Sequence, residues 1–479
     1  LRDIINVNLD RKECFMMEKN DFTKGKISRN ILNLAVPMTL AQLINVLYNI
    51  IDRVYIGRLP HVASHALAGV GITFPIITIV IAFANLIGMG GAPLFSIERG
   101  KNNQSKAEEI MGNSFALLII CGIILTIVIF LFKEPILYLF GASDTIFSYA
   151  NDYISIYLCG SIFVMISLGM NSFINAQGFG KTGMYTVLIG AILNLVLDPL
   201  FIFVFDLGVK GAAIATIISQ FVSALWVLYF LSGGDTIIKL KRESMHLKLC
   251  LVKEIITLGM SGFVMAITNS LVQIVCNATL QQYGGDIYIS VMTVLNSIRE
   301  VITMPVSGIT NGSQPVMSFN YGAGCFRRVK KCIRFMSVVC VSYMVIMWLI
   351  TLAIPDIFIK IFNDDALLLE KGVPAVRLYY FGYFMMAFQF CGQSSFVALN
   401  KSRQAIFFSL FRKVIIVVPL TLWLPTIPSL GVMGVFLAEP ISNFIGGSAS
   451  FLTMLVSVYR KLPARDDRIA SLEEMSMVQ

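Results

Sequence analysis

The chain has 479 residues, of which 56% are AVILMFWYC and only 14% are charged, whereas a soluble protein carries roughly 25% charged residues. The net charge of +9 would suggest nucleic-acid binding only if the basic residues formed a water-exposed domain, and no segment is large and polar enough for one. Because one crossing of a bilayer needs about 20 mainly apolar residues, this composition excludes a soluble protein and predicts an all-α protein with many membrane spans.

Twelve apolar segments of spanning length follow one another along the chain. We predict spans at Ile31–Gly57, Leu67–Leu94, Glu109–Phe132, Thr145–Ser172, Thr182–Phe205, Gly211–Ser232, Lys253–Asn277, Ile287–Gln314, Cys332–Ile354, Leu369–Val397, Gln404–Leu424 and Val432–Tyr459. A charged linker after the sixth span divides them into six and six. The predicted units are an N-terminal segment 1–30, an N-terminal lobe 31–232, a linker 233–252, a C-terminal lobe 253–459 and a tail 460–479.

The distribution of Lys and Arg predicts the orientation. On this topology, 27 of the 37 basic residues fall in the two termini, the linker and the other even-numbered loops, and five fall in the odd-numbered loops. Since cytoplasmic loops carry the excess of Lys and Arg, both termini are expected in the cytoplasm. The chain is polar to about Asn30, which favours a retained first span over a cleaved signal peptide. The basic charge therefore reflects topology, and no nucleic-acid partner is expected.

The two halves of the chain repeat each other. Ser96–Lys101 aligns with Ser318–Ala323 at an offset of 222, and Gly208–Gln220 aligns with Gly431–Asn443 at an offset of 223. An even number of spans per repeat returns the second copy to the same side of the membrane, so we expect two six-helix bundles related by a pseudo-two-fold axis along the membrane normal. A cavity is expected between them.

Two carboxylates in predicted spans are the strongest functional signal. Asp52 lies late in the first span and Asp198 late in the fifth, so both fall in the outer half of the bilayer, where an unpaired charge is costly. Asn194 shares a helix face with Asp198, and Thr216 reaches the same depth in the sixth span. Oxygen ligands of this kind suit Na⁺, K⁺ or a proton. The structural alternative is that Asp198 and Pro199 mark a helix end and that Asp52 pairs with Arg53.

The C-terminal half has no counterpart of this acidic pair. Arg299 and Glu300 in the eighth span and Glu439 in the twelfth could line the cavity, although an internally satisfied packing pair fits them equally well. Nothing in the chain indicates an enzyme. The Gly180–Thr182 tripeptide lacks the first glycine of a Walker A motif, the nine cysteines are scattered, and His61 and His65 lie in a short loop without a third metal ligand.

These features resemble the multidrug and toxic compound extrusion (MATE) family. The resemblance rests on the twelve spans in two repeats, Pro37 fifteen residues before Asp52, the Asn194-x-x-x-Asp198-Pro motif and the run Gly208–Gln220. It implies a cation-coupled antiporter that exports organic compounds across a bacterial inner membrane. It also implies a monovalent cation site in the N-terminal lobe formed by Asp52, Asn194, Asp198 and Thr216, with an Ala212 carbonyl and the further polar positions Tyr153 and Asn171.

Other positions follow from the same resemblance. Pro37 is expected to act as a helix hinge because it leaves the Asn33 carbonyl without its helical donor. Gln389 and Gln393 stand where another branch of the family carries acidic residues, so a cation site in the C-terminal lobe is not expected. No cofactor other than the coupling ion is expected, no ATP is used, and the protein is expected to act as a monomer in the bilayer.

Competing functions are separated by the character of the cavity. A lipid-linked saccharide flippase of the same superfamily is the main alternative, and it would need a strongly cationic cavity for pyrophosphate. A membrane transferase would need larger loops, and a channel would need filter-like repeats. The cargo is a small organic substrate, either a range of drugs or a dedicated secondary metabolite such as the colibactin precursor, and the sequence leaves this choice open.

Overall fold

The computed structural model describes residues 21–59, 63–233, 235–361 and 365–463 and is built of helices. Within these residues, eleven helices are long and apolar enough to cross a membrane. The twelfth crossing is made by two shorter helices, α12 (Ala366–Tyr379) and α13 (Met385–Ala398), which the sequence analysis predicted as one span. The prediction of twelve spans in two bundles is confirmed, and the break in the tenth span is new.

The helices of the N-terminal lobe are α2 (Ile27–Ile56), α3 (Ala63–Gly100), α4 (Gln104–Leu139), α5 (Asp144–Ala176), α6 (Gly180–Pro199), a π-helical turn at Leu200–Val204, and α7 (Gly208–Ser232). All begin before the predicted apolar segments, and α3, α4 and α5 also end after them. A helix of about 36 residues is roughly 54 Å long, longer than the hydrocarbon layer of about 30 Å. The polar ends of these helices therefore continue into the interface, which is why hydropathy alone underestimated their length.

The C-terminal lobe has more interruptions. It comprises α8 (Leu249–Gly284), α9 (Asp286–Gly322), α10 (Phe326–Ala353), the short α11 (Pro355–Lys360), α12, α13, α14 (Ser402–Leu410), α15 (Val418–Trp423), α16 (Met433–Ser442) and α17 (Ser448–Met454). π-Helical turns at Phe411–Val417, Asn443–Gly447 and Leu455–Tyr459 keep the last two crossings continuous. Single π-helical turns inside helices are often found at functional sites.

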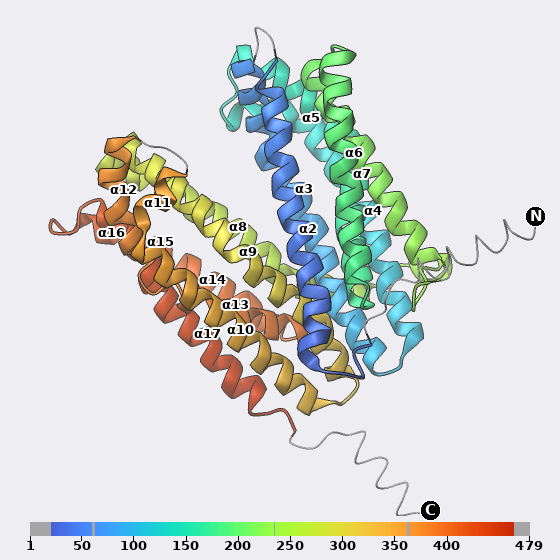
Figure 1. The fold of residues 1–479 in the computed structure, drawn as a ribbon. Helices are drawn as coiled ribbons and strands as arrows, with labels where there is room; N and C mark the ends of the chain where they lie inside the picture. Colours follow the sequence, from blue (N-terminus) through green and yellow to red (C-terminus); the bar gives the residue numbers. More distant parts are fainter. Residues whose placement is uncertain (1–20, 60–62, 234, 362–364, 464–479) are drawn as a thin grey trace, which may run out of the picture.

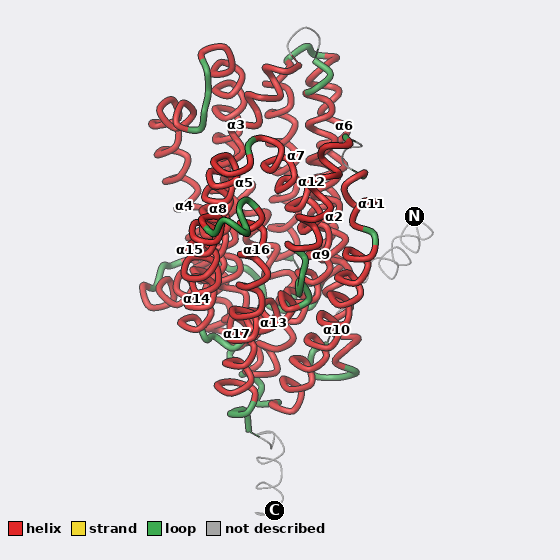
Figure 2. Tube along the Cα trace, turned by 90° about the vertical axis from the view of Figure 1, so that its left-hand side faces the viewer, coloured by secondary structure: helices red, strands yellow, loops and turns green. Residues whose placement is uncertain are grey.

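The two bundles approach each other at one end and diverge toward the other. Figure 1 shows them meeting at the lower end, where the described chain begins and ends, with α2 running upward along the boundary. Figure 2, turned by a quarter, shows that all the helices run broadly along the same long axis. Contacts of α3 with α8 and of α2 and α3 with α9 join the lobes.

Glycines allow this close approach. A Cβ on Gly90 or Gly259 would overlap backbone atoms of the opposite lobe, and the same holds for Gly100 and Gly322. Beside them, the Arg99 guanidinium lies 5.0 Å from the ring centre of Phe22 and 4.6 Å from that of Phe319. We call the four glycines the glycine seam. The seam holds the lobes together with their backbones in direct contact.

The backbone itself preserves the internal repeat. Residues with positive φ recur at nearly constant spacing: Asn102 and Gly324 (62° and 68°), Gly178 and Asn400 (99° and 56°), and Gly208 and Gly431 (53° and 48°). Each pair is separated by 222 or 223 residues. Because left-handed residues end helices at defined turns, this agreement shows that the two halves share the same loop geometry.

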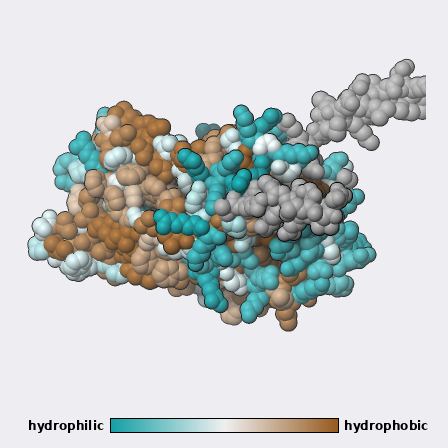
Figure 3. All heavy atoms as spheres, turned by 90° about the horizontal axis from the view of Figure 1, so that it is seen from below, coloured by the Kyte–Doolittle hydropathy of each residue, from teal (hydrophilic) through white to brown (hydrophobic). Residues whose placement is uncertain are grey.

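The outer surface suits a lipid environment. Large side chains such as Leu131, Leu139 and Val204 are exposed on the outside of α4 and the Leu200–Val204 turn. Figure 3, seen from the lower end of Figure 1, shows hydrophilic residues gathered toward one side and hydrophobic residues covering the other. An apolar surface of this extent is expected where lipid tails replace water.

Candidate functional site

Three adjoining hollows lie between the lobes. Their volumes are about 590, 470 and 310 Å³. Glu300, Thr303 and Ser307 of α9 line both larger hollows, and Met89 of α3 lines the first and third. The hollows therefore form one cavity with an N-terminal and a C-terminal wall, as the repeat predicted. A cavity of this size accommodates an organic molecule of drug-like dimensions.

The N-terminal wall contains the predicted carboxylates. Asp52 comes from α2 and lines the cavity, while Asp198 from α6 is 1% exposed and lies behind it. The two carboxyl groups interact directly. The Asn194 amide donates to Asp198 Oδ1 over 2.9 Å, whereas the buried Asp52 Oδ1 has no hydrogen-bond partner. An orphaned buried oxygen beside a second carboxylate is a site that suits a cation.

The neighbouring helices complete this pocket. The Thr216 hydroxyl donates to the Ala212 carbonyl over 3.0 Å, and the Tyr153 side chain hydrogen-bonds Thr216. Helices α2, α5, α6 and α7 thus bring together the carboxylates and all the predicted ligands except Asn171. Their hydroxyl, carbonyl and carboxylate oxygens are the donor set that hard monovalent cations prefer.

Two tyrosines of the pocket were missed by the sequence analysis. Tyr48 lies one turn before Asp52 and interacts with both carboxylates, and Tyr157 stacks on Tyr153 with ring centres 6.2 Å apart. Both follow from helical periodicity, since residues four apart share a face. Applying that spacing to Asp52 and Tyr153 would have identified them.

The structural alternative for Asp52 gains a long-range charge interaction with Arg53 but no direct contact. Among the described residues no ion pair joins Asp52 to Arg53, and the Arg53 guanidinium instead lies 4.4 Å from the ring centre of Phe74. Asp198 and Pro199 do end the α-helical part of α6, but the chain continues in a π-helical turn. The helix end and the polar pocket therefore coincide.

Two other predicted residues lie apart from the pocket. Asn171 lines the cavity, but it is 18 residues from Tyr153 on α5, a distance of roughly 27 Å along a helix, and its amide donates to the Gly183 carbonyl over 3.1 Å. Pro37 is buried within α2, which passes through it as one helix. The structure therefore does not bring Asn171 into the carboxylate group, and the hinge role of Pro37 stays a prediction.

The C-terminal wall carries opposite charge. Arg299, Arg412 and Lys413 line the largest hollow together with one acid, Glu300. Arg412 donates to Glu439 Oε1 over 2.9 Å and to Asn443 Oδ1 over 2.8 Å, and Lys413 lies 3.2 Å from Glu439 Oε1. Glu439 is thus the centre of a buried ion-pair network, which is the packing alternative that the sequence left open.

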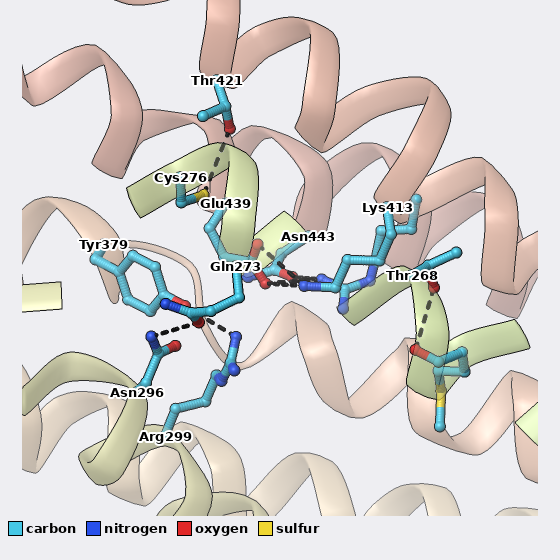
Figure 4. A network of polar contacts seen from close by, with 12 residues as sticks. Thr268, Gln273, Cys276, Asn296, Arg299, Tyr379, Lys413, Thr421, Glu439 and Asn443 are labelled. Atoms are coloured by element: carbon cyan, nitrogen blue, oxygen red, sulfur yellow. Dashed lines mark hydrogen bonds and ion pairs between the residues drawn. The ribbon is translucent and has the colours of Figure 1, made fainter. Parts of the chain in front are cut away.

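The remaining cavity candidates differ in accessibility. Arg299 donates to the Tyr379 hydroxyl over 3.2 Å, beside Asn296 and Gln273, as Figure 4 shows. Gln389 and Gln393 of α13 line the largest hollow, as predicted, but Glu439 reaches only a minor space of about 20 Å³ behind it. The sequence analysis did not single out Arg412 and Lys413, and their contacts with Glu439 are findings of the structure.

Two helical bundles around a polar central cavity, with unpaired carboxylates in one of them, define a membrane transporter. The chain belongs to the MatE family, whose model matches residues 37–200 and 262–423, one segment in each half. It is therefore a multi-pass transport protein of the MATE class.

Named relatives agree with this assignment. The chain is 28% identical over 308 residues to the multidrug export protein MepA of Staphylococcus aureus, and the match covers 63% of this chain and 66% of that protein. It is 26% identical over 399 residues to the MepA protein of Staphylococcus saprophyticus, with 83% and 87% covered. The flippase alternative gains no support from these relatives.

Solved structures show the same fold. A MATE in the bent conformation superposes with a TM-score of 0.85 at 21% identity, covering 95% of this chain and 98% of that chain. A MATE family transporter of the MOP superfamily in an outward-facing conformation gives 0.84 at 21% identity, covering 93% and 99%.

Proposed function

We propose that the protein is a cation-coupled antiporter that exports organic compounds from the cytoplasm by alternating access. The observation that supports this proposal is the buried, unpartnered Oδ1 of Asp52 next to Asp198 on the wall of the interlobe cavity. Two like charges in a poorly solvated pocket repel each other unless a cation joins them. Na⁺, K⁺ or H⁺ entry would relieve that repulsion and favour one arrangement of α2 and α6.

Cation binding and cargo transport would then be coupled because the helices that form the cation pocket also form the contact between the lobes. Asp52 belongs to α2, which also contacts α9 of the other lobe, so a shift of α2 on cation entry changes the interlobe contact. Asp198 is held by α6 at the point where the helix changes to a π-helical turn. Cargo would occupy the space between the lobes, and the cation the pocket within one lobe. Each therefore biases the same equilibrium between inward-open and outward-open states.

The cation site is tested with Asp52→Asn and Asp198→Asn, which keep the shape of the side chain and remove its charge. We expect each purified variant to bind a lipophilic cation such as ethidium comparably to wild type and to lose cation-driven efflux in reconstituted vesicles. Cation affinity in the wild type should fall as pH is lowered, because protons compete for the same carboxylates.

Ser167→Ala provides a matched control. Its hydroxyl donates to Gln220 on the same cavity wall over 2.8 Å, away from the carboxylates, so efflux should persist. If Asp198→Asn still exports against a gradient, the coupling site is wrong. If that variant binds the ion but no cargo, the carboxylates hold substrate instead.

The proposed orientation places both termini and the linker in the cytoplasm of a bacterial cell and has the protein act as a monomer without ATP. The 27-to-5 distribution of basic residues supports this orientation. Lys248 pairs with Glu109 over 2.7 Å, which fixes the linker to the start of α4 near Lys106. In a background without native cysteines, an impermeant thiol reagent should label a cysteine at His61, which lies outside the described residues. Labelling at Lys106 or Lys248 in intact cells would contradict the proposed orientation.

A further inference from the structure

The two walls of the cavity have opposite polarity. The hollow at the N-terminal wall is lined by Asp52, Glu300 and one base, Arg53. The hollow at the C-terminal wall is lined by Arg299, Arg412 and Lys413 and only one acid, Glu300. Burying an excess of charge is unfavourable unless an opposite charge is supplied. Glu439 behind this wall is a second acid, so three bases face two acids and one positive charge is left without a counter-ion among the described side chains.

Arg299 identifies where that anion is missing. Glu439 already accepts ion pairs from Arg412 and Lys413, which are 6% and 3% exposed. Among the described residues, Arg299 has no carboxylate within ion-pair distance, and its one hydrogen bond goes to the neutral Tyr379 hydroxyl. Figure 4 shows Arg299 and Lys413 on opposite sides of the polar network that contains Gln273 and Glu439. A guanidinium presents several donors in a plane, an arrangement that matches a carboxylate.

A second, independent feature of the same wall accepts hydrogen bonds. Gln389 and Gln393 are 7% and 9% exposed, and the Oε1 atom of each is buried without a partner. The Gln393 amide donates to the Ala405 carbonyl over 2.9 Å, which fixes its oxygen as the free group. Both residues line the same hollow as the three bases. Unpartnered buried acceptors are uncommon in folded proteins and indicate a missing donor.

We propose that the C-terminal wall binds amphoteric cargo, with the cargo carboxylate held by Arg299 and its amine or hydroxyl donors by Gln389 and Gln393. This assignment rests on the proposed export function and adds the chemical class of the cargo. The hollow of about 590 Å³ also contains Met265, Met386 and Phe390, which supply apolar surface for an aromatic body. A simple lipophilic cation would satisfy the glutamines and leave Arg299 without an anion.

The test compares two dyes that differ at one group: a rhodamine with a free carboxylate and the methyl ester of the same dye. Binding is measured by fluorescence polarisation on the purified full-length protein without an ion gradient, so that a failure of cation coupling does not affect the result. We expect wild type to bind the free acid more tightly than the ester. Arg299→Gln should weaken binding of the acid by about tenfold, the usual scale of a lost charge-assisted hydrogen bond, and change ester binding less than twofold.

Two variants and one competition complete the test. Arg299→Lys keeps the charge and should restore part of the acid affinity. Arg53→Gln removes a base from the N-terminal wall of the same cavity and should leave the ratio of acid to ester affinity unchanged. Retained ester binding shows that each variant is folded.

Several results would overturn the proposal: no binding of the free acid by wild type, an equal preference for the two dyes, or an equal loss of acid binding in Arg53→Gln. Displacement of the acid by phosphatidylglycerol but not by phosphatidylcholine in mixed micelles would assign the bases to a lipid headgroup and also overturn it. Each result is independent of the efflux assay, because an acid-binding failure leaves export of lipophilic cations possible.

Discussion

Helix α5 and the pair α12 and α13 occupy equivalent places in the two lobes and differ in one feature. Adding 222 to the bounds of α5, Asp144 and Ala176, gives the first residue of α12 and the last of α13, Ala366 and Ala398. Helix α5 is continuous, whereas its counterpart unwinds between Tyr380 and Phe384. The same crossing therefore forms one rigid wall in the N-terminal lobe and two half-helices in the C-terminal lobe.

The same offset relates the charges of the two lobes. Arg412 and Lys413 stand where the N-terminal lobe has Gly190 and Ala191, and all four line the cavity. At the offset of 223 that aligns Gly208–Gln220 with Gly431–Asn443, Glu439 stands where the N-terminal lobe has Thr216. At the cavity, the N-terminal lobe has acids without ion-pair partners, and the C-terminal lobe has two bases paired with one acid. Equivalent backbone positions thus support opposite chemistry.

The largest expected effect is on stability. Glu439→Gln should destabilise the protein by about 3–5 kcal/mol, since it leaves two buried bases without their carboxylate. Asp198→Asn should cause no loss, because it removes one of two neighbouring like charges. Thermal unfolding of both variants in the same detergent measures the difference. A smaller loss for Glu439→Gln than for Asp198→Asn would show that the lobes do not differ in the way described.

The broken helix gives the next effect. Gly382 has a φ of 72° and is the counterpart of Gly160, which lies within continuous α5. Gly382→Ala should cost about 1–2 kcal/mol for the left-handed conformation, and its Cβ would displace the Phe444 ring. At Gly160, inside a regular helix, an alanine meets no left-handed strain and gains up to about 1 kcal/mol of helix propensity, but the Ile217 side chain must shift to admit its Cβ, so we expect a smaller loss there than at Gly382. Equal melting temperatures for the two variants would refute the comparison.

A smaller effect concerns α2 and its counterpart α8. Pro37 in α2 corresponds to Gly259 in α8, so only the N-terminal lobe has a proline at this depth. Pro37→Ala restores the donor for the Asn33 carbonyl and should slow transport by roughly two- to fivefold, equivalent to less than about 1 kcal/mol on the barrier. Initial rates in vesicles with equal amounts of protein provide the measurement. Unchanged rates would remove the hinge role.

The smallest effect is at the linker. Lys241 pairs with Glu108 over 2.9 Å, and this carboxylate raises the pKa of Lys241. Because the folded pKa is the higher one, any contribution is complete below the ordinary Lys pKa and is lost only at more alkaline pH. The pair is exposed, so Lys241→Met should leave the melting temperature unchanged at neutral pH. A clear loss would mean that the linker is held mainly by this ion pair.

The sequence predicted the number of spans, the repeat and the grouping of Asp52, Asn194, Asp198 and Thr216, because hydropathy, spacing and helical periodicity carry that information locally. It did not predict the break in α12 and α13, since Tyr380–Phe384 is as apolar as a continuous span would be. It also missed the pairing of Lys413 with Glu439, which depends on packing between α16 and the Phe411–Val417 turn. The alignment of Glu439 with Thr216 could have indicated this pairing, because Thr216 lies in the pocket of the N-terminal lobe and its counterpart is an acid.

The glycine seam has a consequence for ion leakage. Where Gly90 and Gly100 of one lobe contact Gly259 and Gly322 of the other, backbones touch and no side chain stands between them. Direct backbone contact leaves little room for water at these four positions, and it needs no side-chain rotamer change to open or close. A membrane protein that uses an ion gradient must remain an electrical insulator while its cavity is open to one side. For the ion-coupled export proposed above, the absence of four methyl groups would contribute to that insulation at the end where the lobes meet.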